Sequence, residues 1–366
     1  MSARVWIGLL YGIILVFVTA IECYAPLFAR RDIFFGVTVA PNARATPSAQ
    51  RIIARYRLAV IAIGALGVLT LALALALTTA LDESLVIVGL VAVLILWIGA
   101  LSIPYFWAHA AARALVASGA TGTPPATQPP VATLRPRRYS DYLPWAWEAL
   151  PLALIVATFA ALAWQYPHAP ATLIIHWNAQ GKPNGFARKT PLSYYGEALT
   201  MLPIYALLFG LGYLIARSRA QPDAADLRFK RLMVRFLFGM RTLLVALFGA
   251  IALVIASQTS PQWVIALPIV IIVLVLVTVT TLAFRVGQGG ARLRDTSASP
   301  TDRMADRYWK WGIFYVNPDD PSIMVERRFG MGYTVNFGSP TAVVTFFLLI
   351  GVPIALTLMI SIFATR

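Results

Sequence analysis

The sequence predicts an all-α polytopic membrane protein with about eight transmembrane helices and a small cytoplasmic β-meander before the last helix. The chain of 366 residues is 59% hydrophobic and only 12% charged, with a mean hydropathy of +0.74. These values lie outside the usual range of soluble domains. The apolar residues also gather in long runs, and Lys and Arg gather between alternate runs, as expected of a chain that crosses a membrane repeatedly.

Eight apolar runs reach or nearly reach the length of about 20 residues that a helix needs to cross the apolar core of a bilayer. They are Val5–Phe28, Leu58–Ala80, Leu85–Ala108, Trp145–Trp164, Tyr195–Ala216, Phe236–Ser257, Trp263–Phe284 and Thr341–Phe363. The first run is expected to be a retained helix, because no small-residue cleavage site follows a short apolar core.

The distribution of Lys and Arg predicts the orientation of the chain. Of the 30 basic residues, 24 fall in the segments that follow the first, third, fifth and seventh runs. Because positive residues near helix ends resist translocation, both termini are predicted to face outward. The basic segments that hold this orientation at the lipid bilayer account for the net charge of +15. No nucleic-acid partner is therefore expected.

Composition also predicts how the chain is divided. The segment from Ser118 to Pro136 is rich in Pro, Thr and Ala and is typical of a flexible linker. The expected parts are a three-helix membrane part (1–117), a Pro/Thr-rich cytoplasmic linker (118–143), a four-helix membrane part with an outer loop at 167–194 (144–284), a cytoplasmic loop with a small β element (285–340) and the last transmembrane helix (341–366).

The outer loop contains the stretch "LIIHWNAQGKPNGFARKT", in which an extended piece leads into tight turns. Asn184 and Gly185 suit a type I′ turn. His168 and His176 have no Asp, Glu or Cys nearby to complete a metal shell, so neither a metal nor a cofactor is predicted. The predicted ligand-recognition residues are His176, Trp177, Asn178, Gly181, Pro183, Gly185 and Lys189. The alternative is that His176 only fastens the loop to the helices.

Glu22 and Arg241 are ionisable residues inside apolar runs, each near the cytoplasmic end of its helix. Charges within a membrane are costly unless they are paired, so the two are predicted to form an intramembrane ion pair. Such a pair acts either as an orientation clamp between the first and sixth helices, which is favoured, or as a proton or cation relay.

The last cytoplasmic loop contains "WGIFYVNPDDPSIMVERRFGMGYTVNF", in which three short β-prone pieces surround a Pro-flanked turn. The adjacent Asp319 and Asp320 are expected to close that turn rather than to act in catalysis. No catalytic motif occurs in a suitable context, so the protein is predicted not to be an enzyme. The residues singled out in this β element are Trp311, Asn317, Pro318, Asp319, Asp320, Arg328, Gly330 and Asn336.

The outer loop resembles the uncharacterised membrane domain of SdpI-type bacterial immunity proteins, whose signature is "P..I.IHWN..G.P.G...K". Here it begins at Pro170 and ends at Lys189. The segment from Tyr308 to Gly338 looks like a second uncharacterised domain that accompanies the first in longer bacterial membrane proteins. The resemblance implies a protein of the bacterial cytoplasmic (inner) membrane that gives self-protection against a secreted toxic peptide and signals through a cytoplasmic regulator. The alternative function is a small-solute or lipid transporter, and the third hypothesis is an intramembrane enzyme.

Overall fold

The computed structural model describes residues 3–77, 83–122, 138–177, 182–218, 224–258, 263–287, 290, 292–293, 305–330 and 332–364. The α-helices of this part are α1 (Ala3–Phe28), α2 (Pro47–Leu77), α3 (Glu83–Ala117), α4 (Ala149–Gln165), α5 (Pro191–Leu199), α6 (Met201–Arg217), α7 (Ala224–Ser257), α8 (Trp263–Val286) and α9 (Pro340–Ala364). Among the described residues, eight helical segments, with α5 and α6 forming one of them, are long and apolar enough to cross a membrane. The predicted class of multi-pass helical membrane protein is confirmed.

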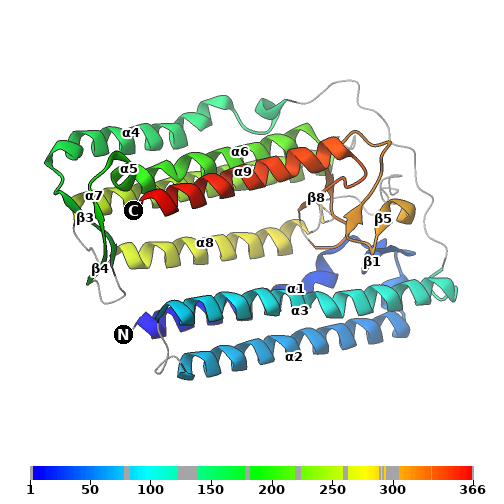
Figure 1. Ribbon diagram of the computed structural model, residues 1–366. Helices are drawn as coiled ribbons and strands as arrows, with labels where there is room; N and C mark the ends of the chain where they lie inside the picture. The colour runs from blue at the N-terminus through cyan, green and yellow to red at the C-terminus, as the bar shows by residue number, and fades with distance from the viewer. Residues whose placement is uncertain are drawn as a thin grey trace.

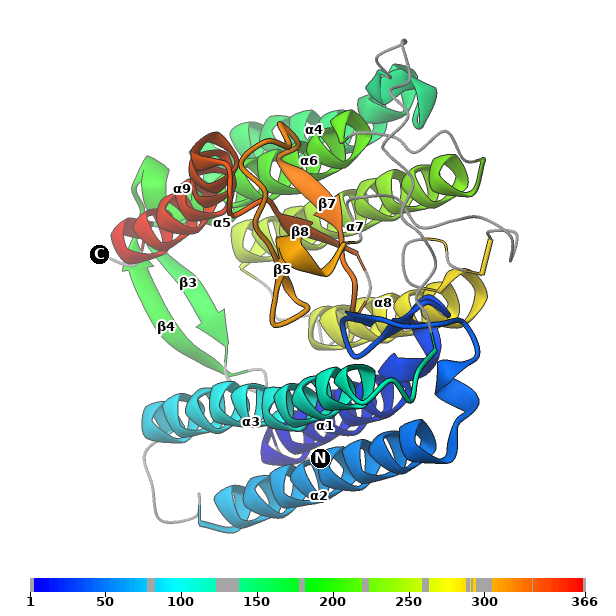
Figure 2. The same cartoon turned by 90° about the vertical axis from the view of Figure 1, so that its right-hand side faces the viewer.

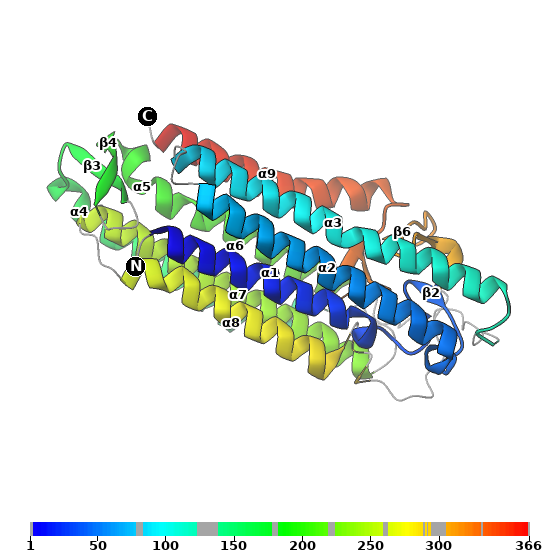
Figure 3. The same cartoon turned by 90° about the horizontal axis from the view of Figure 1, so that it is seen from below.

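The long helices run side by side, and the chain reverses direction at each end (Figures 1 and 3). Both ends of the chain and the strands β3 and β4 lie at one end of the bundle, which we call the hairpin end (Figure 1). The strands β1, β5 and β8 lie at the opposite end, which we call the basic end because the segments with most of the Lys and Arg residues lie there. An even number of crossings places the two termini at the same end, as the sequence predicts.

Two helices begin well before their apolar runs. Helix α2 starts at Pro47, whereas the apolar run within it starts at Leu58. Helix α7 starts at Ala224, whereas the apolar run within it starts at Phe236. Hydropathy marks only the part of a helix that lies in lipid, whereas the hydrogen-bonded helix continues into polar and basic turns outside the lipid. These extensions make the basic end protrude beyond the apolar layer.

The predicted fifth helix is divided into α5 and α6 at Thr200. The hydroxyl of Thr200 donates to the carbonyl oxygen of Glu197 at 2.6 Å, and Pro203 removes a backbone donor from the next turn. A short helix at the hairpin end therefore precedes the longer α6.

The helices form two groups that meet along α8. Figure 2 shows α1, α2 and α3 on one side, α4, α6, α7 and α9 on the other, and α8 between them. The ring of Phe284 in α8 makes edge contacts with Tyr24 and Phe28 of α1, at centroid distances of 5.8 and 5.0 Å. The outer faces remain apolar and open, with Leu96 73% exposed and Phe347 63% exposed. Lipid would cover these faces.

The predicted linker, 118–143, ends in residues that pack against the helices. Its last residues form a short 3₁₀ turn at Tyr139–Asp141. Tyr139, Tyr142 and Leu143 are buried in a core with residues of α6 and α7. These three residues therefore belong to the packed core beside α6 and α7.

In the part of the chain that the structure describes, four small antiparallel hairpins connect the helices. They pair β1 (Ile33–Phe34) with β2 (Val37–Thr38), β3 (Thr172–Trp177) with β4 (Pro183–Arg188), β5 (Trp309–Lys310) with β6 (Phe314–Tyr315), and β7 (Met324–Glu326) with β8 (Tyr333–Val335). The small β element before the last helix is confirmed, as two hairpins joined by one bridge from Tyr315 to Asn336 rather than as one continuous ladder.

Two of these hairpins touch through their turns. Phe35 and Gly36 between β1 and β2 both have positive φ angles (45° and 78°), and Trp311 and Gly312 between β5 and β6 repeat the pattern (51° and 71°). A Cβ built on Gly36 would lie 2.7 Å from the Cα of Gly312. The Tyr105 hydroxyl of α3 donates to the carbonyl oxygen of Trp311 at 3.0 Å. This contact fastens the N-terminal helices to the C-terminal part.

The Gly36 contact predicts a measurable loss of stability. Gly36→Ala adds a methyl group where the facing backbone leaves no room, at a backbone angle that only glycine adopts easily, so we expect a loss of about 1–3 kcal/mol in the free energy of unfolding. Gly119→Ala is the matched control, because Gly119 has a φ of 73° but no atom within 4 Å of its built Cβ. Denaturant unfolding in detergent measures both. Equal losses would show that the turn contact adds nothing.

Candidate functional site

The β3–β4 hairpin lies outside the helix bundle and is joined to it by α4 and α5 (Figure 1). Its inner residues Leu173 and Ala187 are buried, and they pair across the two strands. The outer edge of β3 is closed by the residue that follows α7, because the backbone N–H of Ile174 donates to Oε1 of Gln258 at 2.7 Å. One strand is thus held against the bundle, and β4 lies outside it.

The predicted type I′ turn at Asn184 and Gly185 is wrong. Asn184 and Gly185 lie inside β4, where Gly185 faces His176, and not in a type I′ turn. A Cβ on Gly185 would approach the Cβ of His176 to 2.7 Å, so glycine permits the close pairing. Nδ1 of His176 donates to Oδ1 of Asn184. The register shifts on both sides of His176, which sequence periodicity cannot reveal.

The remaining signature residues are divided between the strands and their surroundings. Trp177 pairs with Pro183 at the tip of the described ladder. Asn178 and Gly181 lie outside the described residues. His168 is exposed in the 3₁₀ turn after α4, and within the described ranges no group of three His, Cys, Asp or Glu side chains is placed to hold a metal ion.

Lys189 anchors the base of the hairpin. Its Nζ donates to the carbonyl oxygen of Ala169 at 2.9 Å and lies 4.6 Å from the centre of the Tyr166 ring. Next to it, Thr190 caps α5 by accepting from the backbone N–H of Ser193 at 3.0 Å, and Ser193 Oγ accepts from the Thr190 N–H at 2.9 Å. Reciprocal capping fixes where the helix begins, and so fixes the hairpin relative to the bundle.

The outer edge of β4 faces away from the protein. The backbone N–H of Lys189 donates inward to Ala171 at 2.8 Å. Because inward and outward groups alternate along an antiparallel strand, the N–H of Arg188 points outward. The side chains of Arg188 and Phe186 are exposed, Phe186 by 58%. The carbonyl oxygen of Arg188 already accepts from the Ser193 hydroxyl at 2.7 Å, so the part of this edge that can pair with another extended chain runs from the Arg188 N–H to Phe186.

The predicted ion pair between Glu22 and Arg241 is wrong. Nη2 of Arg241 pairs instead with Oε1 of Glu148, at the start of α4. Glu148 also accepts from the hydroxyls of Tyr139 at 2.7 Å and Tyr205 at 3.1 Å. The guanidinium lies 4.9 Å from the centre of the Tyr205 ring. Both charged residues are buried, Glu148 at 5% exposure and Arg241 at 1%.

Glu22 has a different partner as well. Its Oε2 accepts from the hydroxyl of Tyr56 in α2 at 3.0 Å. Two helices that each contain a charge need not turn those charges toward each other, and α1 packs against α2 and α8. The sequence did contain a signal for the true partner, since Glu148 falls in the first turn of the predicted fourth run.

A network of buried amides closes the turn before α9. Asn336 is fully buried, and its Nδ2 donates to the carbonyl oxygens of Asn317 and Asp320 at 2.8 and 2.7 Å. Asp320 is buried and accepts from the hydroxyl of Tyr315 at 3.1 Å. Pro318 and Asp319 are exposed at the turn. In this arrangement the carboxylate of Asp320 is used to hold the turn.

Arg328 lies at the junction of the two helix groups. It is 1% exposed and bonds through Nη2 to Asp306 at 2.6 Å and to the hydroxyl of Thr38. Burial lowers the pKa of Arg328, and the Asp306 carboxylate opposes that shift. No sequence motif indicated a role for Asp306 or Thr38. Gly330 follows with a φ of 78°, and Trp311 is exposed in the turn described above.

The Glu148–Arg241 pair predicts coupled effects on stability. Arg241→Met or Glu148→Gln leaves one buried group without its partner, so each should lower the free energy of unfolding by about 3–5 kcal/mol. The double variant should lose clearly less than the sum of the single losses, because it removes both charged groups.

Denaturant unfolding in detergent measures this cycle. Glu22→Gln combined with Arg241→Met is the control, and its losses should add because the two residues have separate partners. Additive losses for Glu148 and Arg241 would contradict the pairing.

Comparison with protein families places matches on two of the segments described above. Residues 153–195, which include the β3–β4 hairpin, match a domain of unknown function, DUF1648. Residues 318–343, which include the Asn336 turn, match a family of unknown function, DUF5808. No curated protein and no solved structure matches the chain. The chain is therefore similar to two uncharacterised domain families, and neither match names an SdpI-type protein.

Proposed function

We propose that this chain is a non-enzymatic protein of the bacterial cytoplasmic membrane that protects the cell against a secreted toxic peptide, in the manner of SdpI-type immunity proteins. The observation that supports this function best is the exposed outer edge of β4. An extended peptide can add to such an edge through backbone hydrogen bonds, and exposed side chains then select its sequence. Phe186 and Arg188 are the side chains placed to do so.

The orientation required by this proposal agrees with the charge distribution. The basic segments lie at the end opposite the hairpin, and basic segments are retained in the cytoplasm. The β3–β4 hairpin and both termini would then face outward, where a secreted peptide arrives.

The local chemistry favours a peptide over a metal ion or a small anion. Lys189 is directed to the Ala169 carbonyl oxygen, and His176 is directed to Asn184. These two side chains build the hairpin, and the backbone of β4 provides the recognition surface. A partner with an apolar residue opposite Phe186 and an acidic residue opposite Arg188 would fit it.

The test uses a strain that lacks the gene, grown in culture supernatant of its parent. We expect the deletion strain to be inhibited and the intact gene to restore growth. Arg188→Gln should restore growth in part, because it removes the charge that would face an acidic residue but keeps the outward N–H. Arg188→Pro removes that N–H together with the same charge, so it should fail to restore growth at an equal protein level.

Two results would overturn the proposal. If the deletion strain grows as well as its parent in that supernatant, the protein does not protect the cell against a secreted peptide. Full restoration by Arg188→Pro would show that the β4 edge is not used. A cytoplasmic regulator at the basic end and a transport activity stay predictions from the sequence.

A further inference from the structure

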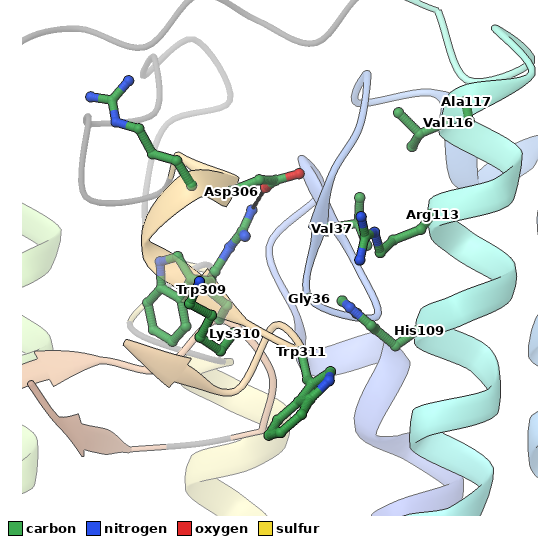
Figure 4. Close-up of a pocket in the computed structure, with 12 residues that line it drawn as sticks. Gly36, Val37, His109, Arg113, Val116, Ala117, Asp306, Trp309, Lys310 and Trp311 are labelled. Atoms are coloured by element: carbon green, nitrogen blue, oxygen red, sulfur yellow. Dashed lines mark hydrogen bonds and ion pairs between the residues drawn. The ribbon is translucent and has the colours of Figure 1, made fainter. Parts of the chain in front are cut away.

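A cavity of about 700 Å³ opens at the basic end, between the two helix groups. One wall is the last turns of α3, with His109 and Arg113, and the opposite wall is the β5–β6 hairpin, with Lys310 and Trp311. Figure 4 shows His109 and Arg113 projecting from α3 toward the side where the residues of that hairpin lie. Its volume lies in the range of small-molecule sites.

The lining is strongly positive. It contains four cationic side chains and one carboxylate, and they are Arg113, Arg307, Lys310, Arg328 and Asp306. The carboxylate is already engaged, because Asp306 accepts from Arg328 and from the Thr38 hydroxyl at 2.7 Å. For Arg113 and Lys310, no ion pair is formed with any described residue. An anion in the cavity would therefore meet an uncompensated positive charge.

The shape of this site is fixed before any ligand arrives. Nδ1 of His109 donates to the carbonyl oxygen of Phe35 at 2.7 Å, which ties α3 to the β1–β2 turn. Arg328 ties the β7–β8 hairpin to Thr38 of β2. The two walls come from segments about two hundred residues apart in the chain, and the Tyr105 hydroxyl of α3 joins them by donating to the carbonyl oxygen of Trp311 at 3.0 Å. Such preorganisation lowers the cost of binding.

The cavity lies at the depth where the chain leaves the apolar layer. The third apolar run ends at Ala108, so His109 and Arg113 occupy the first turns beyond it. Exposed aromatic residues surround the opening: Trp311 is 62% exposed, and its ring lies 6.4 Å from that of Phe106, which is 41% exposed. Amphipathic aromatic rings favour the level of lipid headgroups.

We infer that this cavity binds a phosphate group, with Arg113 and Lys310 as the residues that contact it. The positive lining suits a phosphate anion, and the aromatic opening at interfacial depth favours the headgroup of an anionic phospholipid as its source. This site is separate from the β4 edge and does not depend on the function proposed for it.

Native mass spectrometry of the full chain in neutral detergent tests this site. Dioleoylphosphatidylglycerol should bind with one lipid retained more tightly than the others, and dioleoylphosphatidylcholine should not. In the double variant Arg113→Ala and Lys310→Ala, affinity for that lipid should fall at least tenfold. Both side chains are exposed, so the thermal unfolding of the lipid-free variant should remain unchanged.

Arg228→Ala with Arg235→Ala is the matched control, since it removes two exposed charges from α7 at the same end but outside the cavity. It should retain the tight lipid. Glycerol 3-phosphate, added in place of lipid, distinguishes the sources: binding of this compound that depends on Arg113 and Lys310, without tight lipid binding, supports a soluble phosphate ligand. Equal losses in the two double variants, or no binding of either probe, would overturn the site.

Discussion

The ion pair between Glu148 and Arg241 is the interaction on which the C-terminal helices depend. A guanidinium this deeply buried is tolerated because a carboxylate neutralises it and aromatic faces surround it. The pair joins the start of α4 to the middle of α7, and Tyr205 adds α6 through its hydroxyl. Since the β3–β4 hairpin connects α4 to the helix that continues into α6, the same buried charges set the direction in which the hairpin faces.

A second constraint unites the two halves of the protein at the basic end. The turn at Phe35 and Gly36 meets the turn at Trp311 and Gly312 with almost no space between their backbones. The hydroxyl of Tyr105 in α3 donates to the carbonyl oxygen of Trp311 at the same place. Arg328 and Asp306 continue it through Thr38. These contacts hold the two groups of helices at a fixed distance. The cavity lies beside the contacts, between the two groups.

Hydropathy predicted the eight crossings and the shared side of the termini, because the energy of placing polar groups in lipid depends on composition alone. It could not predict how each helix is rotated about its axis, so Arg241 was assigned to the wrong carboxylate although Glu148 lay in an identified run. The positions of Asn184 and Gly185 inside a strand depend on a register shift that local turn preferences do not contain. The approach of Gly36 to Gly312 depends on contacts across most of the chain.

That approach also has a consequence for synthesis. The turn at Phe35 and Gly36 is made about 275 residues before its partner at Trp311 and Gly312. At ordinary translation speeds the interval between them is on the order of tens of seconds. During that time the buried rings of the first turn have no cover from the β5–β6 hairpin, so the helices made before it need lipid or a chaperone to shield this surface until that hairpin has been made.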